Sequence, residues 1–213
     1  MVDFRKFLGV NQIAGFKPPL PSCRIIHPAQ GETIPPVKWL QIGTEYVGGE
    51  ALSLLLYSAN MFRDLQDELA SGLARVCFSL DGVKPHDKAP HPMSLLCAEC
   101  PRQEECLFCY TLFVQDEASG LAGLWTLRGM AANRFSMFMS VFTSEKARKE
   151  MKFPLRITVR PSIVSAQKRL FNVPQFGVNT STRLSEKERE TAIQVLEDRY
   201  DLNRLAMLES PTE

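Results

Sequence analysis

Four of the six cysteines in this chain lie within one short segment. Cys97, Cys100, Cys106 and Cys109 form the pattern C-x2-C-x5-C-x2-C. Each C-x-x-C pair makes a tight turn that directs two thiolates toward one point, and four thiolates satisfy the tetrahedral coordination of Zn²⁺. Because such a site leaves no coordination position open for water, we expect structural rather than catalytic zinc. In a chain without an evident export signal, paired cysteines favour a metal site over disulfides.

The fourth zinc ligand has two candidates. Cys109 runs directly into the apolar segment 110–114, and if that segment is a strand its thiol can pack in the core as a small hydrophobic group. Cys77 would then complete the site, because the Asp-Gly turn at 81–82 can bring the chain toward the other cysteines. The remaining ligands are the same in both cases: Cys97, Cys100 and Cys106.

The charges are separated along the chain, although the whole chain carries only +1. Residues 121–184 contain eleven basic and two acidic residues, a net charge of +9, so the remainder carries −8. A basic segment of this size indicates a polyanion-binding surface, most simply for nucleic acid.

The hydrophobic pattern predicts a mainly β domain of the α+β class. Strands are expected at 37–42, 73–78, 110–114, 121–127, 153–163 and 168–176, helices at 133–150 and from Ser185 onward, and either a helix or a strand at 49–71. At 153–163 apolar and polar residues alternate strictly, and 168–176 is expected to return antiparallel to it. Ser185 and Glu188 form a capping box at the start of the last helix.

These elements predict an OB-like antiparallel barrel of five or six strands with a zinc-knuckle insertion and a C-terminal helix. The expected organisation is an irregular Pro-rich arm at 1–36, the OB-like domain at 37–184 with the knuckle at about 77–109, and a helix with a tail at 185–213. The strand face of such a barrel binds single strands through basic groups on phosphates and aromatic rings on bases. The candidates are Lys38, Trp39, Trp125, Arg128, Arg156, Arg160, Lys168, Arg169 and Phe171.

The order of motifs resembles the zinc-containing single-stranded DNA-binding proteins of phages and mobile elements. The resemblance covers about 34–200 and is carried by IPPVKWLQ at 34–41, CFSLDG at 77–82, CAECP at 97–101, Cys106 and FNVPQF at 171–176. It implies an OB fold, Cys77 as a zinc ligand, and cooperative or protective binding of single strands in replication or recombination. Replication or recombination proteins are then expected partners, and the number of copies that assemble is left open, with a dimer among the options.

Other classes of function fit the sequence less well. The chain has no H-x-E before its C-x-x-C pair, as a zinc deaminase would, and no Gly-rich phosphate loop. Its three histidines lie beside or near prolines, so we expect no enzyme. The longest apolar run, at 52–57, is far shorter than a membrane span, and a cytoplasmic location in a bacterial or phage-infected cell is expected. The alternative is a zinc-stabilised protein–protein adaptor or inhibitor that binds no nucleic acid.

Overall fold

The structure, a computed structural model, describes residues 19–29, 37–69, 72–140, 153–166, 169–178 and 184–200. By their internal contacts the residues of the chain belong to two units. One unit is Ser22–Leu184, and it contains every strand described here; the other joins Met1–Pro21 and Ser185–Glu213.

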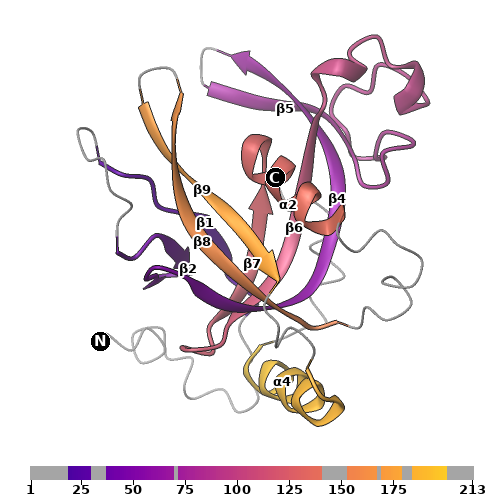
Figure 1. Cartoon of the computed structure of the whole chain (residues 1–213). Coiled ribbons are helices and arrows are strands. Elements are labelled where there is room, and N and C mark those ends of the chain that lie inside the picture. The colour runs from indigo at the N-terminus through magenta and orange to yellow at the C-terminus, as the bar shows by residue number, and fades with distance from the viewer. Residues whose placement is uncertain are drawn as a thin grey trace, which may run out of the picture. The chain divides into compact units, whose positions relative to one another are not determined.

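The strand-bearing unit is built on one nine-stranded sheet, drawn in Figure 1. Neighbouring strands follow the order β3-β2-β1-β7-β6-β4-β8-β9, and β5 pairs with β4 outside this path. All pairs are antiparallel except β1 with β7, which are parallel. The strands are β1 (Ser22–Ile25), β2 (Leu40–Ile42), β3 (Glu45–Val47), β4 (Leu52–Leu69), β5 (Gly72–Ser79), β6 (Leu107–Asp116), β7 (Ala122–Leu127), β8 (Leu155–Ala166) and β9 (Arg169–Val178).

Strand β4 organises the sheet because it pairs with three other strands. Its residues 52–56 pair with β8, 54–64 with β6, and 63–69 with β5. Register shifts after Leu56 and after Leu65 mark bulges, which bend a strand and increase its twist. The second half of β4 therefore extends beyond β8 and, together with β5, forms the arm that carries the cysteine segment (Figure 1).

The apolar core lies between the sheet and helix α2 (Gly129–Ser140). Phe135 of α2 is fully buried and packs edge-on against Phe176 of β9, with ring centroids 5.1 Å apart. Trp39 and Trp125 belong to the same core, with exposed fractions of 0% and 1%. Trp39 satisfies its buried indole N–H by donating from Nε1 to the carbonyl oxygen of Gly49 over 3.0 Å.

The sheet curls into a half-barrel, so that its last strand reaches the chain leaving β1. The backbone N of Asn172, on β9, donates to Nδ1 of His27 over 3.1 Å, and its Nδ2 donates to the carbonyl oxygen of Ile26 over 3.4 Å. Phe171 packs edge-on against the His27 ring at a centroid distance of 5.6 Å. These contacts join two segments that lie more than 140 residues apart in the sequence.

The contact between His27 and Asn172 predicts that stability falls as the medium becomes acidic. Burial, with the charge of Arg24, lowers the pKa of His27 below its usual 6.5. Between the folded-state pKa and 6.5 the unfolded chain binds more protons, so stability is lost as pH falls through that window. Urea midpoints at pH 7.5 and 5.5 should differ more for the natural chain than for His27→Asn. Equal differences would contradict the prediction.

Several predicted elements are confirmed. The hairpin at 110–127 is β6 and β7, the segment at 73–78 is β5, and 168–176 returns antiparallel to 153–163 as β9 and β8. Helix α4 (Glu186–Arg199) begins at the predicted capping box, in which Ser185 and Glu188 each bond the backbone N of the other.

Other predictions are corrected. The ambiguous region 49–71 is a strand, β4, and residues 22–25 of the expected irregular arm form β1 inside the sheet. The sheet has nine strands where five or six were expected. Helix α2 begins at Gly129, before the predicted start, and 141–150 of the predicted helix lie outside the described residues. Among the described helices, none combines the length and apolarity needed to cross a membrane.

Candidate metal centre and nucleic-acid interface

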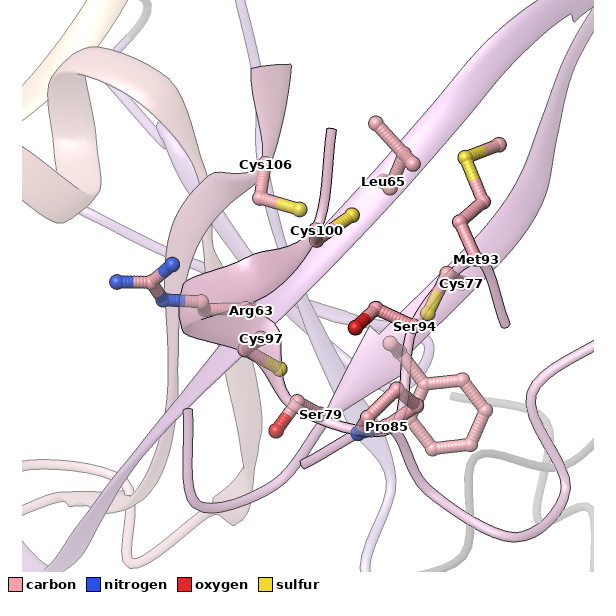
Figure 2. A pocket seen from close by; sticks show the side chains of 11 residues that line it. Arg63, Leu65, Cys77, Ser79, Pro85, Met93, Ser94, Cys97, Cys100 and Cys106 are labelled. Carbon is pink, nitrogen blue, oxygen red and sulfur yellow. The ribbon is translucent and has the colours of Figure 1, made fainter. Parts of the chain in front are cut away.

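One small pocket is lined by four of the six cysteines. Cys77 comes from β5, Cys97 from the 3₁₀ turn η2 (Cys97–Glu99), Cys100 follows that turn, and Cys106 precedes β6. Figure 2 shows these side chains around the pocket, with Met93 and Ser79 among the other residues that line it. Its cavity volume of about 20 Å³ suits a single ion or a water-sized group.

A tight turn after β5 brings the cysteine segment to this place. Oδ1 of Asp81 accepts bonds from the backbone N of Val83 (2.8 Å) and of Lys84 (3.1 Å), and Gly82 has a φ of +73°, which glycine adopts without strain. The carbonyl oxygen of Val83 then accepts the backbone N–H of Cys97 over 2.8 Å. The CFSLDG motif therefore supplies both Cys77, which lines the pocket, and the turn that positions Cys97.

Arg102 attaches the loop between Cys100 and Cys106 to strand β4. Its guanidinium donates to both carboxylate oxygens of Asp67 (2.6 and 3.1 Å) and to Glu105, whose closest oxygen is 2.6 Å away. These hydrogen bonds from Arg102 lower the pKa of Asp67 and of Glu105. The hydrogen bonds from the Arg102 guanidinium to Asp67 are bidentate and charge-assisted. They fix the orientation of the loop, although an ion pair at the surface contributes little to stability.

The electrostatics of the pocket favour a bound cation. Burial raises the pKa of the Cys77 thiol, and the negative charges of Cys106, Cys97 and Cys100 raise it further. Burial likewise raises the pKa of Cys106, followed by the charge of Cys100, while the charge of Arg63 opposes this rise. Thiolates so close together repel one another unless a metal ion neutralises them, and binding a metal would release their protons.

The four cysteine thiols that line the pocket are suitable donors for zinc. Their present positions, however, do not form a coordination sphere. Four soft sulfur donors from three separate elements match a closed, structural Zn²⁺ site. Over the ranges that the structure describes, no group of three or more His, Cys, Asp or Glu side chains is positioned to hold a metal ion as it stands. Zinc would therefore have to draw the four thiols together, which needs side-chain rotation and a small closure of the turns.

Cys109 lies outside the pocket, which corrects its inclusion among the predicted ligands. Its side chain is fully buried on β6, and its Sγ donates weakly to the carbonyl oxygen of Leu107 over 3.8 Å. Burial, then the neighbouring Asp64 charge, raises its pKa to about 11, so the thiol stays protonated. The alternative with Cys77 as the fourth ligand is the one that agrees with this geometry.

Two of the predicted stacking residues cannot contact a base in this structure. Trp39 and Trp125 are buried in the core, so the prediction that they stack on bases is wrong. Trp125 lies on β7 and Trp39 immediately precedes β2, and both belong to the core cluster that contains Phe135 of α2. A large apolar ring on the covered side of a sheet is driven into the core. Phe171 is half-buried on β9 beside His27 and retains an accessible part.

Two of the predicted phosphate contacts are engaged by carboxylates. Arg128 is 3.0 Å from Oδ2 of Asp64, a fully buried side chain, and Nε of Arg156 donates to Glu117 over 2.9 Å. Arg128 therefore has a structural partner, which weakens the case for a phosphate contact there. Lys168 lies outside the described residues.

The remaining predicted residues share one face of the hairpin formed by β8 and β9. Arg160 pairs with Gln175, Val164 with Phe171, and Ala166 with Arg169, and directly paired residues project from the same face. Arg160 and Arg169 are exposed. Neither strand contains an acidic residue, and neither does α2, so these three elements carry only basic charges, with Glu117 of another segment paired to Arg156 of β8.

A second exposed row was missed by sequence reasoning. Arg24, Gln41 and Tyr46 are paired successively across β1, β2 and β3, and Tyr46 is 47% exposed. Lys38 is exposed beside Trp39, whose carbonyl oxygen accepts the N–H of Ile26 over 2.8 Å. The three-residue strands β2 and β3 are too short to show an alternating pattern, so the sequence carried no signal for the side that Tyr46 faces.

Comparisons of the chain with protein-family models, with curated proteins and with solved structures find no match.

Proposed function

We propose that this protein is an OB-like, single-stranded DNA-binding protein with a structural zinc ion held by Cys77, Cys97, Cys100 and Cys106. The observation that carries the proposal is the face of β8 and β9. It combines the exposed Arg160 and Arg169 with an accessible aromatic ring in two strands that lack any acid. Phosphates need such cations and bases need such rings, whereas a solvated surface ordinarily mixes both signs of charge.

The curled sheet supports this reading of the β8–β9 face. The contacts of Asn172 with Ile26 and His27 bring β9 next to the chain between β1 and β2. Arg169 of β9 and Arg24 of β1 therefore lie on two segments that these contacts join, although β9 and β1 are not paired in the sheet. Tyr46, two strands further along, replaces the buried tryptophans as the exposed ring on which a base would stack.

Zinc has an architectural role in this proposal. It would fix the cysteine segment to the β4–β5 arm, while the phosphate contacts lie on strands that contain no ligand. Single-strand binding would protect DNA during replication or recombination, and none of the proposed residues performs a chemical step.

The variant Arg160→Ala/Arg169→Ala is expected to bind a labelled ~30-nucleotide single strand about 10-fold more weakly at low salt. Each lost phosphate contact should also reduce the slope of log K against log salt by about 0.7. Fluorescence anisotropy of the zinc-loaded protein at 50 to 200 mM salt measures both quantities.

The matched control is Lys84→Ala/Lys88→Ala, which removes the same charge from exposed positions in the cysteine segment. If both double variants lose equal affinity, a general charge effect replaces the proposed face. If the natural chain binds no single strand at 50 mM salt, DNA binding itself is wrong.

The second candidate is a zinc-stabilised protein–protein adaptor. It is favoured by exposed apolar side chains, since seven of the fifteen large ones among the described residues lie at 80–108, including Leu95 at 88% and Val83 at 60% exposure. Exposed apolar groups concentrated around one element mark interaction surfaces. The same titration separates the candidates, because an adaptor would show no salt-dependent affinity for single strands.

A further inference from the structure

Arg63 is a charged residue of β4 that lines the cysteine pocket. Its strand pairs place it opposite Phe108 of β6 and Ser79 of β5, so it stands between the two strands from which Cys106 and Cys77 reach the pocket. The guanidinium carbon lies over the Phe108 ring, 4.5 Å from its centroid. In the view of Figure 2, Arg63 and Cys106 lie toward one end of the pocket, and Cys77 and Met93 toward the other.

The Nε–H group of Arg63 is buried and has no hydrogen-bond partner among the residues that the structure describes. Leaving a buried donor unsatisfied is costly, more so when the group is charged, and native proteins pair nearly all such groups. Only one other buried side-chain atom among those residues, Oδ1 of Asn172, is in the same condition. The unpaired Nε–H of Arg63 therefore indicates that an acceptor for it forms when the pocket binds a ligand.

The pocket supplies such an acceptor once it holds a metal. Four thiolates around Zn²⁺ carry a net charge of −2, and their sulfur atoms accept N–H groups. Among the described residues no sulfur atom is in hydrogen-bonding geometry with this Nε–H, so the bond would form only as zinc draws the four sulfur atoms together. Cys106 also lines the pocket, and in Figure 2 it is drawn toward the same end as Arg63.

We propose that Arg63 is a positioning residue of the zinc centre, whose Nε–H donates to the metal-bound thiolate of Cys106 and whose charge offsets the excess negative charge of the site. The inference rests on the proposed zinc site and deepens it. Stacking on Phe108 fixes the plane of the guanidinium, and Nε is its buried nitrogen that lacks a partner among the described residues. Arg63 thereby couples the metal to β6 as well as to β4.

The test compares the full chain with Arg63→Met, Arg63→Lys and Lys88→Met. Zinc affinity is measured by competition with a chelating dye, and Co²⁺-loaded protein reports the thiolate-to-metal charge-transfer band. Arg63→Met should bind zinc about 10-fold more weakly or worse, the usual effect of losing a partner outside the ligand shell. Arg63→Lys keeps the charge and should lie between, with a shifted band, while Lys88→Met should match the natural chain.

Unfolding of the chelator-treated proteins separates this role from ordinary packing. Without metal the Nε–H is unsatisfied, so Arg63→Met should leave the unfolding midpoint unchanged or raise it. A midpoint that falls without metal while zinc affinity is unchanged overturns the inference and leaves the zinc site standing. A natural chain that binds no zinc overturns the zinc site as well, so the two failures are distinguishable.

Discussion

Replacing any one of Cys77, Cys97, Cys100 or Cys106 with serine is expected to weaken zinc binding by about 100-fold or more. A structural zinc site contributes on the order of 10–16 kcal/mol, so the loss of one ligand in four removes about 3 kcal/mol. A tenfold change corresponds to about 1.4 kcal/mol, which gives the stated factor. Chelator competition and native mass spectrometry measure the affinity and the number of zinc ions per chain.

The matched control is Cys109→Ala. Cys109 is buried on β6 and does not line the pocket, so this change should cost a little packing and leave one zinc ion per chain. A loss of zinc from Cys109→Ala together with its retention in Cys77→Ser would restore the ligand set formed by the two C-x-x-C pairs. Equal retention by all five variants would exclude zinc from the pocket.

The same substitutions predict how far the effect spreads through the fold. The pocket joins β5 to the segment before β6, and Leu65, Val76 and Phe78 form a small core beside it, apart from the main core. Loss of zinc should therefore lower protection from hydrogen exchange in β5 and at 80–106, while β7 and α2 remain protected. This pattern follows because local opening involves the contacts near the lost ligand first.

Strands were predicted best from the sequence where a strand lies between the same two partner strands along the predicted segment. At 155–160 the alternation is unbroken because β8 has a fixed inner and outer face along its pairing with β4 and β9. The C-terminal helix was equally clear, since the capping box of Ser185 is a local interaction that no distant contact has to complete.

The same reasoning could not decide between a helix and a strand for 49–71, which is strand β4, and the cause is physical. The bulge after Leu56 places an extra residue, Tyr57, in β4, and an added residue exchanges the faces of everything that follows. The irregularity after Leu65 places the extra residue, Val76, in the partner strand β5. The three successive partners of β4 also change which side is buried, so that Leu54, Leu55 and Leu56 are all covered. The resulting sequence imitates a helix, although every part of it is extended.

Some residues of the candidate site could be predicted from local spacing, whereas others depend on contacts with distant parts of the chain. The three candidate ligands at 97–106 were predicted from their spacing. The preference for Cys77 over Cys109 depends on which face of β6 is covered, and the residues themselves left that choice open. The tryptophans were misassigned because neither the position of Trp39 just before β2 nor that of Trp125 within β7 indicates in the sequence which side its ring faces. The acidic partners of Arg128 and Arg156 lie 64 and 39 residues away, respectively, beyond any local pattern.

The Asp64→Ala variant is expected to lose about 3 kcal/mol of stability. The Asp64 side chain is fully buried, and its carboxylate accepts from Nε of Arg75 (2.7 Å), from Arg128 (3.0 Å) and from Nε2 of Gln66 (2.8 Å). Removing one partner of a buried ion pair costs about 3–5 kcal/mol, because the other charge is left uncompensated. The lower end applies here, since Arg75 and Arg128 keep exposed fractions of 27% and 42% and can regain water.

Urea unfolding measures this loss, with Asp67→Ala as the matched control. Asp67 also lies on β4 and also binds an arginine, Arg102. This pair lies at the surface, where an ion pair contributes little to stability. A comparable loss in both variants would mean that burial of Asp64 is not the cause. Asp64→Asn keeps the size and one acceptor and should lose less than Asp64→Ala.

The buried carboxylate also decides what Arg128 does. If Arg128 mainly holds the junction between β7 and α2 to β4, then Arg128→Ala should lower stability and leave single-strand affinity within about twofold, unlike the Arg160→Ala/Arg169→Ala variant. If instead Arg128 binds phosphate, its replacement should weaken binding as much as that double variant and leave stability unchanged. The first outcome follows from the structure, because a phosphate would have to compete for Arg128 with a carboxylate that has no access to water.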